Sequence, residues 1–270
     1  MRGEAMSAPG LVSRPSVTVN IPPKRVASAL ACIVVSLGFM HLVINILHYR
    51  FGHDYLWGFL RQFHLNQESN IPTWYSVSTL LVASLLLALI GLTKYRLRDP
   101  YRAHWLCLAA IFLYLSADEG SRLHEMSEVL YPHSHYSGLF YYPWVIGGTV
   151  AVLVIGLSYI KFVLRLPAGI RGLVIVAGFL YVGGALGMEA VQAAFEEGHG
   201  YKNLSYDLLT GVEEVCEMAG IAVFIYALMR YAGSMPQTVA LSFHPPETTH
   251  PRRRRSKGPS LMESGSSRTA

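Results

Sequence analysis

The stretch SVSTLLVASLLLALIGLT, residues 76–93, contains no ionisable side chain. A helix rises about 1.5 Å per residue, so roughly 20 apolar residues cross the roughly 30 Å hydrocarbon core of a bilayer. The stretch WVIGGTVAVLVIGLSYI, residues 144–160, has the same character. Both stretches predict transmembrane helices, and the 52% apolar content and mean hydropathy of +0.34 favour a membrane protein over a soluble one.

Four further windows are apolar over much of their length. We therefore predict an all-α polytopic membrane protein with six transmembrane helices, near residues 26–48, 72–93, 103–123, 143–164, 171–191 and 207–230. The N-terminal segment 1–25 and the Pro- and Ser-rich basic tail 232–270 are predicted to be disordered cytoplasmic segments. A transmembrane bundle then occupies residues 26–231.

Lysine and arginine side chains gather in every second connection of the predicted bundle. The connection after the second window holds Lys94, Arg96, Arg98 and Arg102, and the connection after the fourth holds Lys161, Arg165 and Arg171. Because positive charge stays on the cytoplasmic side, we expect both termini inside, in the inner (plasma) membrane. The net charge of +5 reflects this topology and the basic tail, so it indicates contact with membrane lipids and no nucleic-acid partner.

The stretch SADEGSRLHEMSEVL, residues 116–130, places acids directly after an apolar run. Counting about 1.5 Å per residue from the predicted membrane surfaces brings residues of four helices to a similar depth. These residues are His41, Asp118, Glu214 and Glu217, with Glu189 slightly nearer the outer surface, which His124, Glu125 and Glu128 mark. Helical spacing also aligns Asp207 with Glu214 and Glu217. The pattern predicts a polar pocket in the outer half of the bilayer.

Charged side chains at this depth need compensation, since each costs about 2.5–3.5 kcal/mol near the bilayer centre. Asp118 and Arg122 can pair at i, i+4, but Arg122 is the only basic residue near that level. The other acids can be protonated or hydrated, as in a proton or cation pathway, or they can bind a metal.

We interpret the pocket as the site of a metal-dependent enzyme that acts on a lipid-like substrate. The expected cofactor is a divalent metal, zinc or iron, bound among His41, Asp118, His124, Glu125, Glu189 and Glu214. Glu119 and Glu217 are the expected general acid and base. Two alternatives use the same acids: a proton or divalent-cation transporter or channel, and a scaffold subunit of a membrane complex. The oligomeric state stays open.

The stretch FHLNQESNIPTWYS, residues 63–76, leads into the second window. Pro72 suits the first turn of a helix, and Asn70 or Ser69 is expected to cap that helix. The alternative is that Glu68 folds over the acids as a lid.

Two motifs, NQESNIPTWYS before one window and LSADEGSRLHE after the next, resemble a widespread set of bacterial multi-span membrane proteins. In that set an E-x-N-x-P-T-W segment precedes a D-E-x-x-x-x-H-E segment, and the resemblance covers about residues 35–230. It implies architecture and no mechanism. A more distant likeness is to ceramidase-like and adiponectin-receptor-like membrane hydrolases, which hold zinc among their helices. This chain departs from them in having six predicted spans instead of seven and no His-x-x-x-His on the last.

Overall fold

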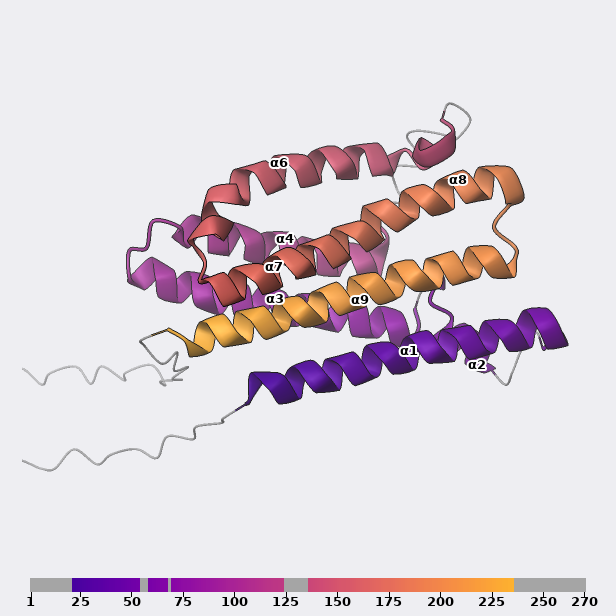
Figure 1. The fold of residues 1–270 in the computed structure, drawn as a ribbon, viewed down its shortest axis with the longest axis horizontal. Coiled ribbons are helices and arrows are strands. Elements are labelled where there is room, and N and C mark those ends of the chain that lie inside the picture. Colours follow the sequence, from indigo (N-terminus) through magenta and orange to yellow (C-terminus); the bar gives the residue numbers. More distant parts are fainter. Residues whose placement is uncertain (1–20, 54–57, 68, 124–135, 236–270) are drawn as a thin grey trace, which may run out of the picture. The chain divides into compact units, whose positions relative to one another are not determined.

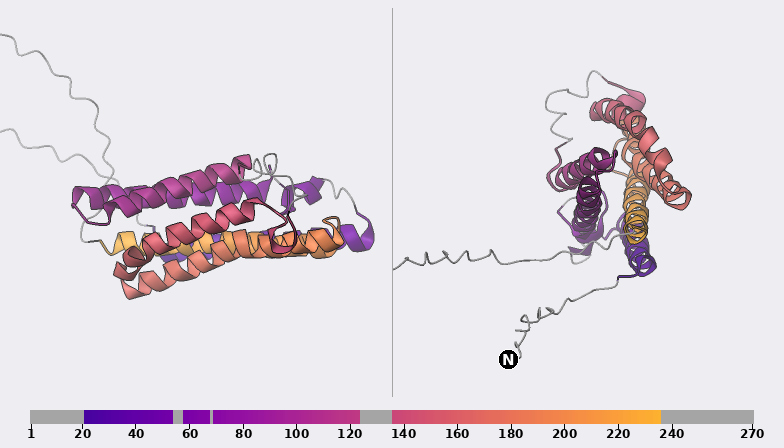
Figure 2. Two further views of the ribbon diagram at one scale, coloured as in Figure 1. Left: turned by 90° about the horizontal axis from the view of Figure 1, so that it is seen from above. Right: turned by 90° about the vertical axis from the view of Figure 1, so that its left-hand side faces the viewer.

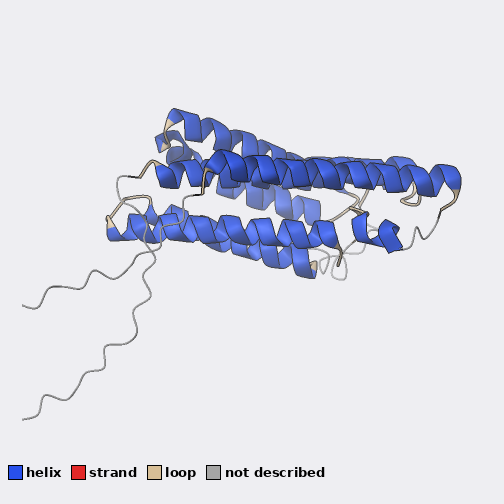
Figure 3. Ribbon diagram, turned by 90° about the horizontal axis from the view of Figure 1, so that it is seen from below, coloured by secondary structure: helices blue, strands red, loops and turns tan. Residues whose placement is uncertain are grey.

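The structure is a computed structural model that describes residues 21–53, 58–67, 69–123 and 136–235. The chain divides into a unit of residues 1–238 and a C-terminal unit of residues 239–270, and the second unit lies outside the described residues. The described part contains helices and loops and no strand (Figure 3). The all-α prediction is therefore confirmed.

A helix occupies each of the six predicted windows. The elements are α1 (Pro23–Phe51), α2 (Phe59–Phe63), α3 (Ile71–Arg96), α4 (Arg102–Ser121), the 3-10 turn η3 (Gly138–Phe140), α6 (Trp144–Arg165), α7 (Ala168–Val182), the π-helical turn η4 (Gly183–Met188), α8 (Glu189–His199) and α9 (Leu204–Gly233). The fifth window was predicted to end near residue 191, whereas α7, η4 and α8 run as one helical element to His199.

Four helical elements are long and apolar enough to cross a membrane: α1, α3, α6 and the composite helix Ala168–His199. They indicate a multi-pass membrane protein. The other two windows correspond to α4 and α9, of 20 and 30 residues, which carry acidic residues along part of their length. Six spans and their orientation stay predictions.

The longest helix, α9, lies at the centre of the bundle. It packs beside α1 on one side and α7 on the other, while α3 and α4 form a closely packed pair next to this layer (Figures 1 and 2). Glycines on α9 allow this helix to approach α7 and α1 closely. A Cβ atom at Gly220 would lie 2.8 Å from the backbone nitrogen of Tyr181 on α7, and one at Gly211 would lie 2.6 Å from the His41 ring on α1.

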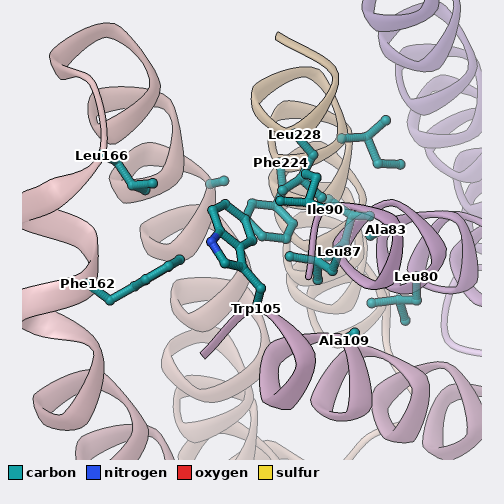
Figure 4. Close-up of a cluster of buried hydrophobic side chains, with 13 residues drawn as sticks. Leu80, Ala83, Leu87, Ile90, Trp105, Ala109, Phe162, Leu166, Phe224 and Leu228 are labelled. Atoms are coloured by element: carbon teal, nitrogen blue, oxygen red, sulfur yellow. The ribbon is translucent and has the colours of Figure 1, made fainter. Parts of the chain in front are cut away.

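The apolar core lies where α3 ends and α4 begins. Trp105 of α4 contacts Phe162 of α6 edge to face, with ring centroids 4.9 Å apart, and packs near Leu87 of α3 (Figure 4). Leu87 and Leu228 of α9 are fully buried there. This cluster packs the helices together at one end of the bundle, which we call the basic end. We define it by the described basic residues Lys94, Arg96, Arg98, Arg102, Lys161, Arg165, Arg171 and Arg230. The opposite end is called the acidic end.

The α3–α4 connection is held by Asp99 at the basic end. Its carboxylate accepts hydrogen bonds from the backbone N–H of Tyr101 at 2.8 Å and from Nζ of Lys94 at 3.1 Å. Partial burial opposes ionisation of Asp99, but these two donors outweigh it and lower the pKa of the carboxyl group.

The cap predicted for the second window is confirmed. Asn70 precedes α3, and its side-chain oxygen accepts a hydrogen bond from the backbone N–H of Thr73 at 3.0 Å. Pro72 occupies the first turn. Glu68, the alternative lid residue, lies outside the described residues.

Candidate functional site

A cavity of about 1380 Å³ lies among α4, α6, the α7–η4–α8 element and α9. Pockets for small molecules usually have volumes of about 300–1,000 Å³, so this one has room for a large ligand. Leu65, Asn66 and Gln67 from the loop before α3 also line it. Along α4 the lining runs from Leu108 to Arg122, which corresponds to about 21 Å of helix.

The lining changes character along the bundle, most clearly on α4, on α9 and along the composite helix formed by α7, η4 and α8. Toward the basic end it is apolar, with Leu108, Ile111, Phe112 and Leu115 of α4, Val152, Ile155 and Phe162 of α6, Val174 and Ala177 of α7, and Ile221 and Phe224 of α9. Toward the acidic end α4, α8 and α9 contribute polar side chains, and α6 contributes Trp144 next to Tyr142. The cavity is therefore amphipathic, with one hydrocarbon-like end and one charged end.

Seven carboxylate side chains line the charged end: Asp118 and Glu119 from α4, Glu189 and Glu196 from α8, and Glu213, Glu214 and Glu217 from α9. Arg122 is the one Lys or Arg in the lining among the described residues. Seven negative charges against one positive charge create a strongly negative potential, unless protons or a bound cation offset it.

Glu213 lies at the centre of the acids and is 6% exposed. Its carboxyl group accepts a hydrogen bond from Nε2 of Gln192, whose Oε1 in turn accepts one from Oγ1 of Thr210 at 2.7 Å. The carboxyl group of Glu189 is a close neighbour of Glu213. Two ionised carboxylates side by side repel each other, so a proton or a bound cation would stabilise the pair.

The turn η4 packs closely against a second acid of α9, Glu217. A Cβ atom at Gly184 would lie 2.8 Å from Cγ of Glu217 and 2.9 Å from the backbone oxygen of Glu213. Only glycine fits this approach of η4 to α9 without displacing one of them. Gly184 thus sets how closely the composite helix packs against the acid-bearing face of α9.

Aromatic side chains cover the charged end. Nε1 of Trp144, at the start of α6, donates a hydrogen bond to Glu189 at 3.3 Å. The Tyr142 hydroxyl donates to Glu196 and lies 3.1 Å from the hydroxyl of Tyr206 on α9. Burial and the bond to Glu196 raise the pKa of Tyr142 well above its usual value, so this hydroxyl stays protonated as a donor.

A separate polar network joins α1 to α9 and to the loop before α3. Nδ1 of His41 accepts a hydrogen bond from the backbone N–H of Leu65 at 3.0 Å, so the proton lies on Nε2, which donates to the backbone oxygen of Asp207 at 2.8 Å. The Asp207 carboxylate accepts from the Tyr49 hydroxyl at 2.8 Å and lies 3.5 Å from Nε2 of His64. Neither His41 nor Asp207 lines the cavity.

The structure brings together most of the predicted site residues that it describes. Asp118, Glu119, Glu189, Glu214 and Glu217 all line the cavity, and His41 does not, because it faces the α1–α9 network. The alignment of Asp207 with Glu214 and Glu217 is corrected in the same way, since Asp207 contacts Tyr49 and His64. His124, Glu125 and Glu128 lie outside the described residues.

Sequence reasoning did not select Glu213 and its partners Gln192 and Thr210 as site residues. The signal was present, because Thr210, Glu213 and Glu217 follow each other at helical spacings of three, four and seven on α9. Over residues 21–53, 58–67, 69–123 and 136–235, no three His, Cys, Asp or Glu side chains are grouped so that they could hold a metal ion. The expected metal site that uses His124 and Glu125 stays a prediction.

A family profile described as "Domain of unknown function (DUF8692)" matches residues 27–232. This range contains every element that lines the cavity. No curated protein and no solved structure shows significant similarity to the chain.

Proposed function

The chain belongs to the DUF8692 family, which is defined by a domain of unknown function, and we propose its role from the cavity. In this proposal it is a multi-pass membrane protein that binds a lipid-like amphiphile with a positively charged head group. The observation that carries this proposal is the division of one continuous cavity into an apolar end and an end lined by seven carboxylates. A hydrocarbon chain fits the first end and a cation fits the second.

The aromatic lining supports a cationic head group. Tyr142, Trp144, Tyr181 and Tyr206 stand among the carboxylates in the cavity wall. Organic cations are attracted both to carboxylates and to the faces of aromatic rings, so a quaternary or primary ammonium group suits these surroundings. A phosphate or carboxylate head group would meet strong repulsion there.

In this proposal α4 and α9 cross the membrane together with the four apolar helical elements, which gives six spans. Positive charge favours the cytoplasmic side, so the basic end faces the cytoplasm and the charged end of the cavity lies in the outer half of the plasma membrane. The amphiphile then lies parallel to the lipids, with its head group at the level of the acids.

The neighbouring acids Glu189 and Glu213 favour exchange of the bound cation against a proton. Two adjacent carboxylates repel each other when both are ionised, so a proton stabilises the pair when no cation is bound. Because a cation is stabilised by the ionised form of both acids, binding expels the proton, and the reverse exchange releases the cation. Such competition is the elementary step of proton-coupled transport.

The decisive experiment measures binding of a fluorescent alkyltrimethylammonium probe to the full chain in phosphatidylcholine nanodiscs. We expect saturable binding of this probe and none of a sulfonate with the same chain. Glu213→Gln should weaken binding about tenfold to hundredfold, since a hydrogen bond or contact to a charged group contributes about 1.5–3 kcal/mol. Glu197→Gln is the matched control, because Glu197 is exposed and outside the cavity lining.

Equal affinity for the cationic and the anionic probe would contradict the proposal. So would Glu213→Gln binding as tightly as the parent protein. Proton release on binding, followed with a pH indicator in weak buffer, tests the exchange step separately.

A metal-dependent enzyme acting on a lipid-like substrate is the second candidate, favoured by the number of carboxylates in one cavity. Zinc or iron bound by the predicted ligand set, which includes His124 and Glu125 outside the described residues, would polarise a carbonyl group, with Glu119 or Glu217 as acid or base. Metal analysis of the purified protein separates the candidates. About one equivalent of metal, lost in Asp118→Ala and Glu214→Ala, supports the enzyme.

A further inference from the structure

Helix α6 is attached to α4 at the basic end of the bundle. The Tyr159 hydroxyl donates a hydrogen bond to the backbone oxygen of His104 at 2.9 Å. One turn further along α6, Phe162 contacts Trp105 edge to face at 4.9 Å and stacks on His104 at 5.7 Å. These rings close the apolar end of the cavity between the two helices.

At the other end, α6 is attached to the composite helix. Trp144 and Tyr142 donate hydrogen bonds to Glu189 and Glu196 of α8. One turn into α6, a Cβ atom at Gly148 would lie 2.8 Å from Cδ2 of Leu186 in η4, so the Leu186 side chain packs directly against the backbone of α6 there. On this side α6 therefore closes the cavity.

Between these attachments the cavity separates α6 from α4. Counting seven residues, or about 10 Å, from the contact between His104 and Tyr159 places Ile111 of α4 level with Val152 of α6, and both line the cavity. Tyr114 of α4 also lines the cavity and is nevertheless 55% exposed. A large side chain with both properties indicates that the cavity reaches the outside of the bundle along α4.

We infer that the ligand enters and leaves the cavity sideways from the bilayer, between the central parts of α4 and α6. This α4–α6 portal is defined by Ala110, Ile111 and Tyr114 of α4 and by Ala151, Val152 and Ile155 of α6. The inference rests on the proposed function. It adds the source of the ligand, which is the lipid phase and not the aqueous phase.

The chemistry of the portal agrees with this route. Its side chains are apolar apart from one phenol group, so a hydrocarbon chain can pass between them without leaving an apolar medium. The head group then needs to move only along the cavity toward the carboxylates, which attract it. An amphiphile that dissolves in lipid is thereby concentrated at the portal before it binds.

A cross-link across the portal tests the inference. Ile111→Cys and Val152→Cys are combined in a background in which Cys32, Cys107 and Cys216 are replaced by alanine, and a bifunctional thiol reagent joins them. Exchange of the fluorescent alkyltrimethylammonium probe in nanodiscs should slow about tenfold or more after cross-linking, while probe bound beforehand should be retained. A cross-link between Tyr95→Cys and Arg102→Cys, which are exposed neighbours on α3 and α4 outside the cavity lining, should leave the exchange rate unchanged.

A second pair of variants avoids cross-linking. Ala151→Trp narrows the portal and should slow exchange, whereas Leu153→Trp, on the same helix and 58% exposed outside the cavity lining, should not. Unchanged exchange in both the cross-linked protein and Ala151→Trp, with saturable binding intact, would overturn the sideways route and leave the proposed function standing. Absence of saturable binding in the parent protein would overturn both.

Discussion

His41 shows how a polar side chain is accommodated in an apolar bundle. Its ring is 2% exposed, and both nitrogens have backbone partners, the N–H of Leu65 and the oxygen of Asp207. Because one nitrogen accepts and the other donates, the neutral ring satisfies both partners without any charge. The residue thereby fastens the loop before α3 and the start of α9 to α1.

Replacing His41 by alanine removes both hydrogen bonds inside the protein. The N–H of Leu65 would be left without an acceptor, which costs about 1–3 kcal/mol, and removal of the buried ring would leave a cavity that costs more. His41→Ala should therefore lower the free energy of unfolding by about 2–5 kcal/mol. Thermal unfolding of the detergent-solubilised protein, followed by circular dichroism, measures this loss.

His199→Ala is the control, since His199 is exposed at the end of α8. It should leave the unfolding temperature unchanged. A His41→Ala protein as stable as the parent would mean that water replaces both partners of the ring.

At the scale of elements, small residues shape the apolar end of the cavity. Gly156 of α6 and Gly178 of α7 line it, and nothing lies within 4 Å of a Cβ atom built at either one. A larger side chain at these positions would therefore extend into the space assigned to the hydrocarbon chain without displacing protein atoms.

Gly178→Leu should shorten the chain that the cavity accepts. Excluding about two methylene groups loses about 1.6 kcal/mol, so a long-chain alkyltrimethylammonium should bind about fifteenfold more weakly. A short-chain probe should keep its affinity. Titrations with probes of increasing chain length measure the shift.

Gly172→Leu provides the comparison on the same helix. Gly172 also has open space around it, but it does not line the cavity. Both changes raise helix propensity equally, so a difference between them reports on the cavity alone. The same loss of affinity for short and long probes in Gly178→Leu would argue against a hydrocarbon chain at this end.

Hydropathy predicted the helices well because burial in lipid or in the core selects apolar residues over a whole helix length. It did not predict the end of the fifth window, since Glu189, Gln192 and Glu196 look like a helix leaving the membrane. In the structure these side chains face the cavity, and the helix continues to His199. A helix that lines a polar cavity needs no apolar side chains on its cavity face, so a drop in hydropathy does not mark the end of such a helix.

At the scale of the molecule, most of the described charges are sorted between the two ends, with exceptions that include Asp99 at the basic end and Arg122 among the carboxylates. The arginines and lysines of α3, α4 and α6 lie at the basic end, and the cavity carboxylates lie toward the other. From this asymmetry the positive-inside rule predicts an orientation with the basic end in the cytoplasm.

Labelling of single cysteines with a membrane-impermeant thiol reagent tests that orientation. In a cysteine-free background, Lys202→Cys, in the exposed α8–α9 connection, should react in intact cells. Arg96→Cys, exposed at the end of α3, should react only after the membrane is opened. The reverse pattern would place the carboxylates in the cytoplasmic half and contradict the orientation.

The level of the site residues along the helices could be predicted from the sequence, but the direction in which their side chains point could not. Counting residues along helices brought Asp118, Glu189, Glu214 and Glu217 to one level, and the structure places all four in one cavity. The same count included His41, which faces a different neighbour. Depth follows from the rise per residue, whereas the direction of a side chain depends on how each helix is turned against its partners, which one sequence does not reveal.

The π-helical turn η4 bears on how the charged wall of the cavity is aligned. In a regular α-helix, one added residue rotates everything after it by about 100°. A wide turn holds one residue more than an α-helical turn, so it takes up an added residue without that rotation. Glu189, Gln192 and Glu196 therefore keep the direction that α7 sets, and they continue the cavity wall that α7 begins.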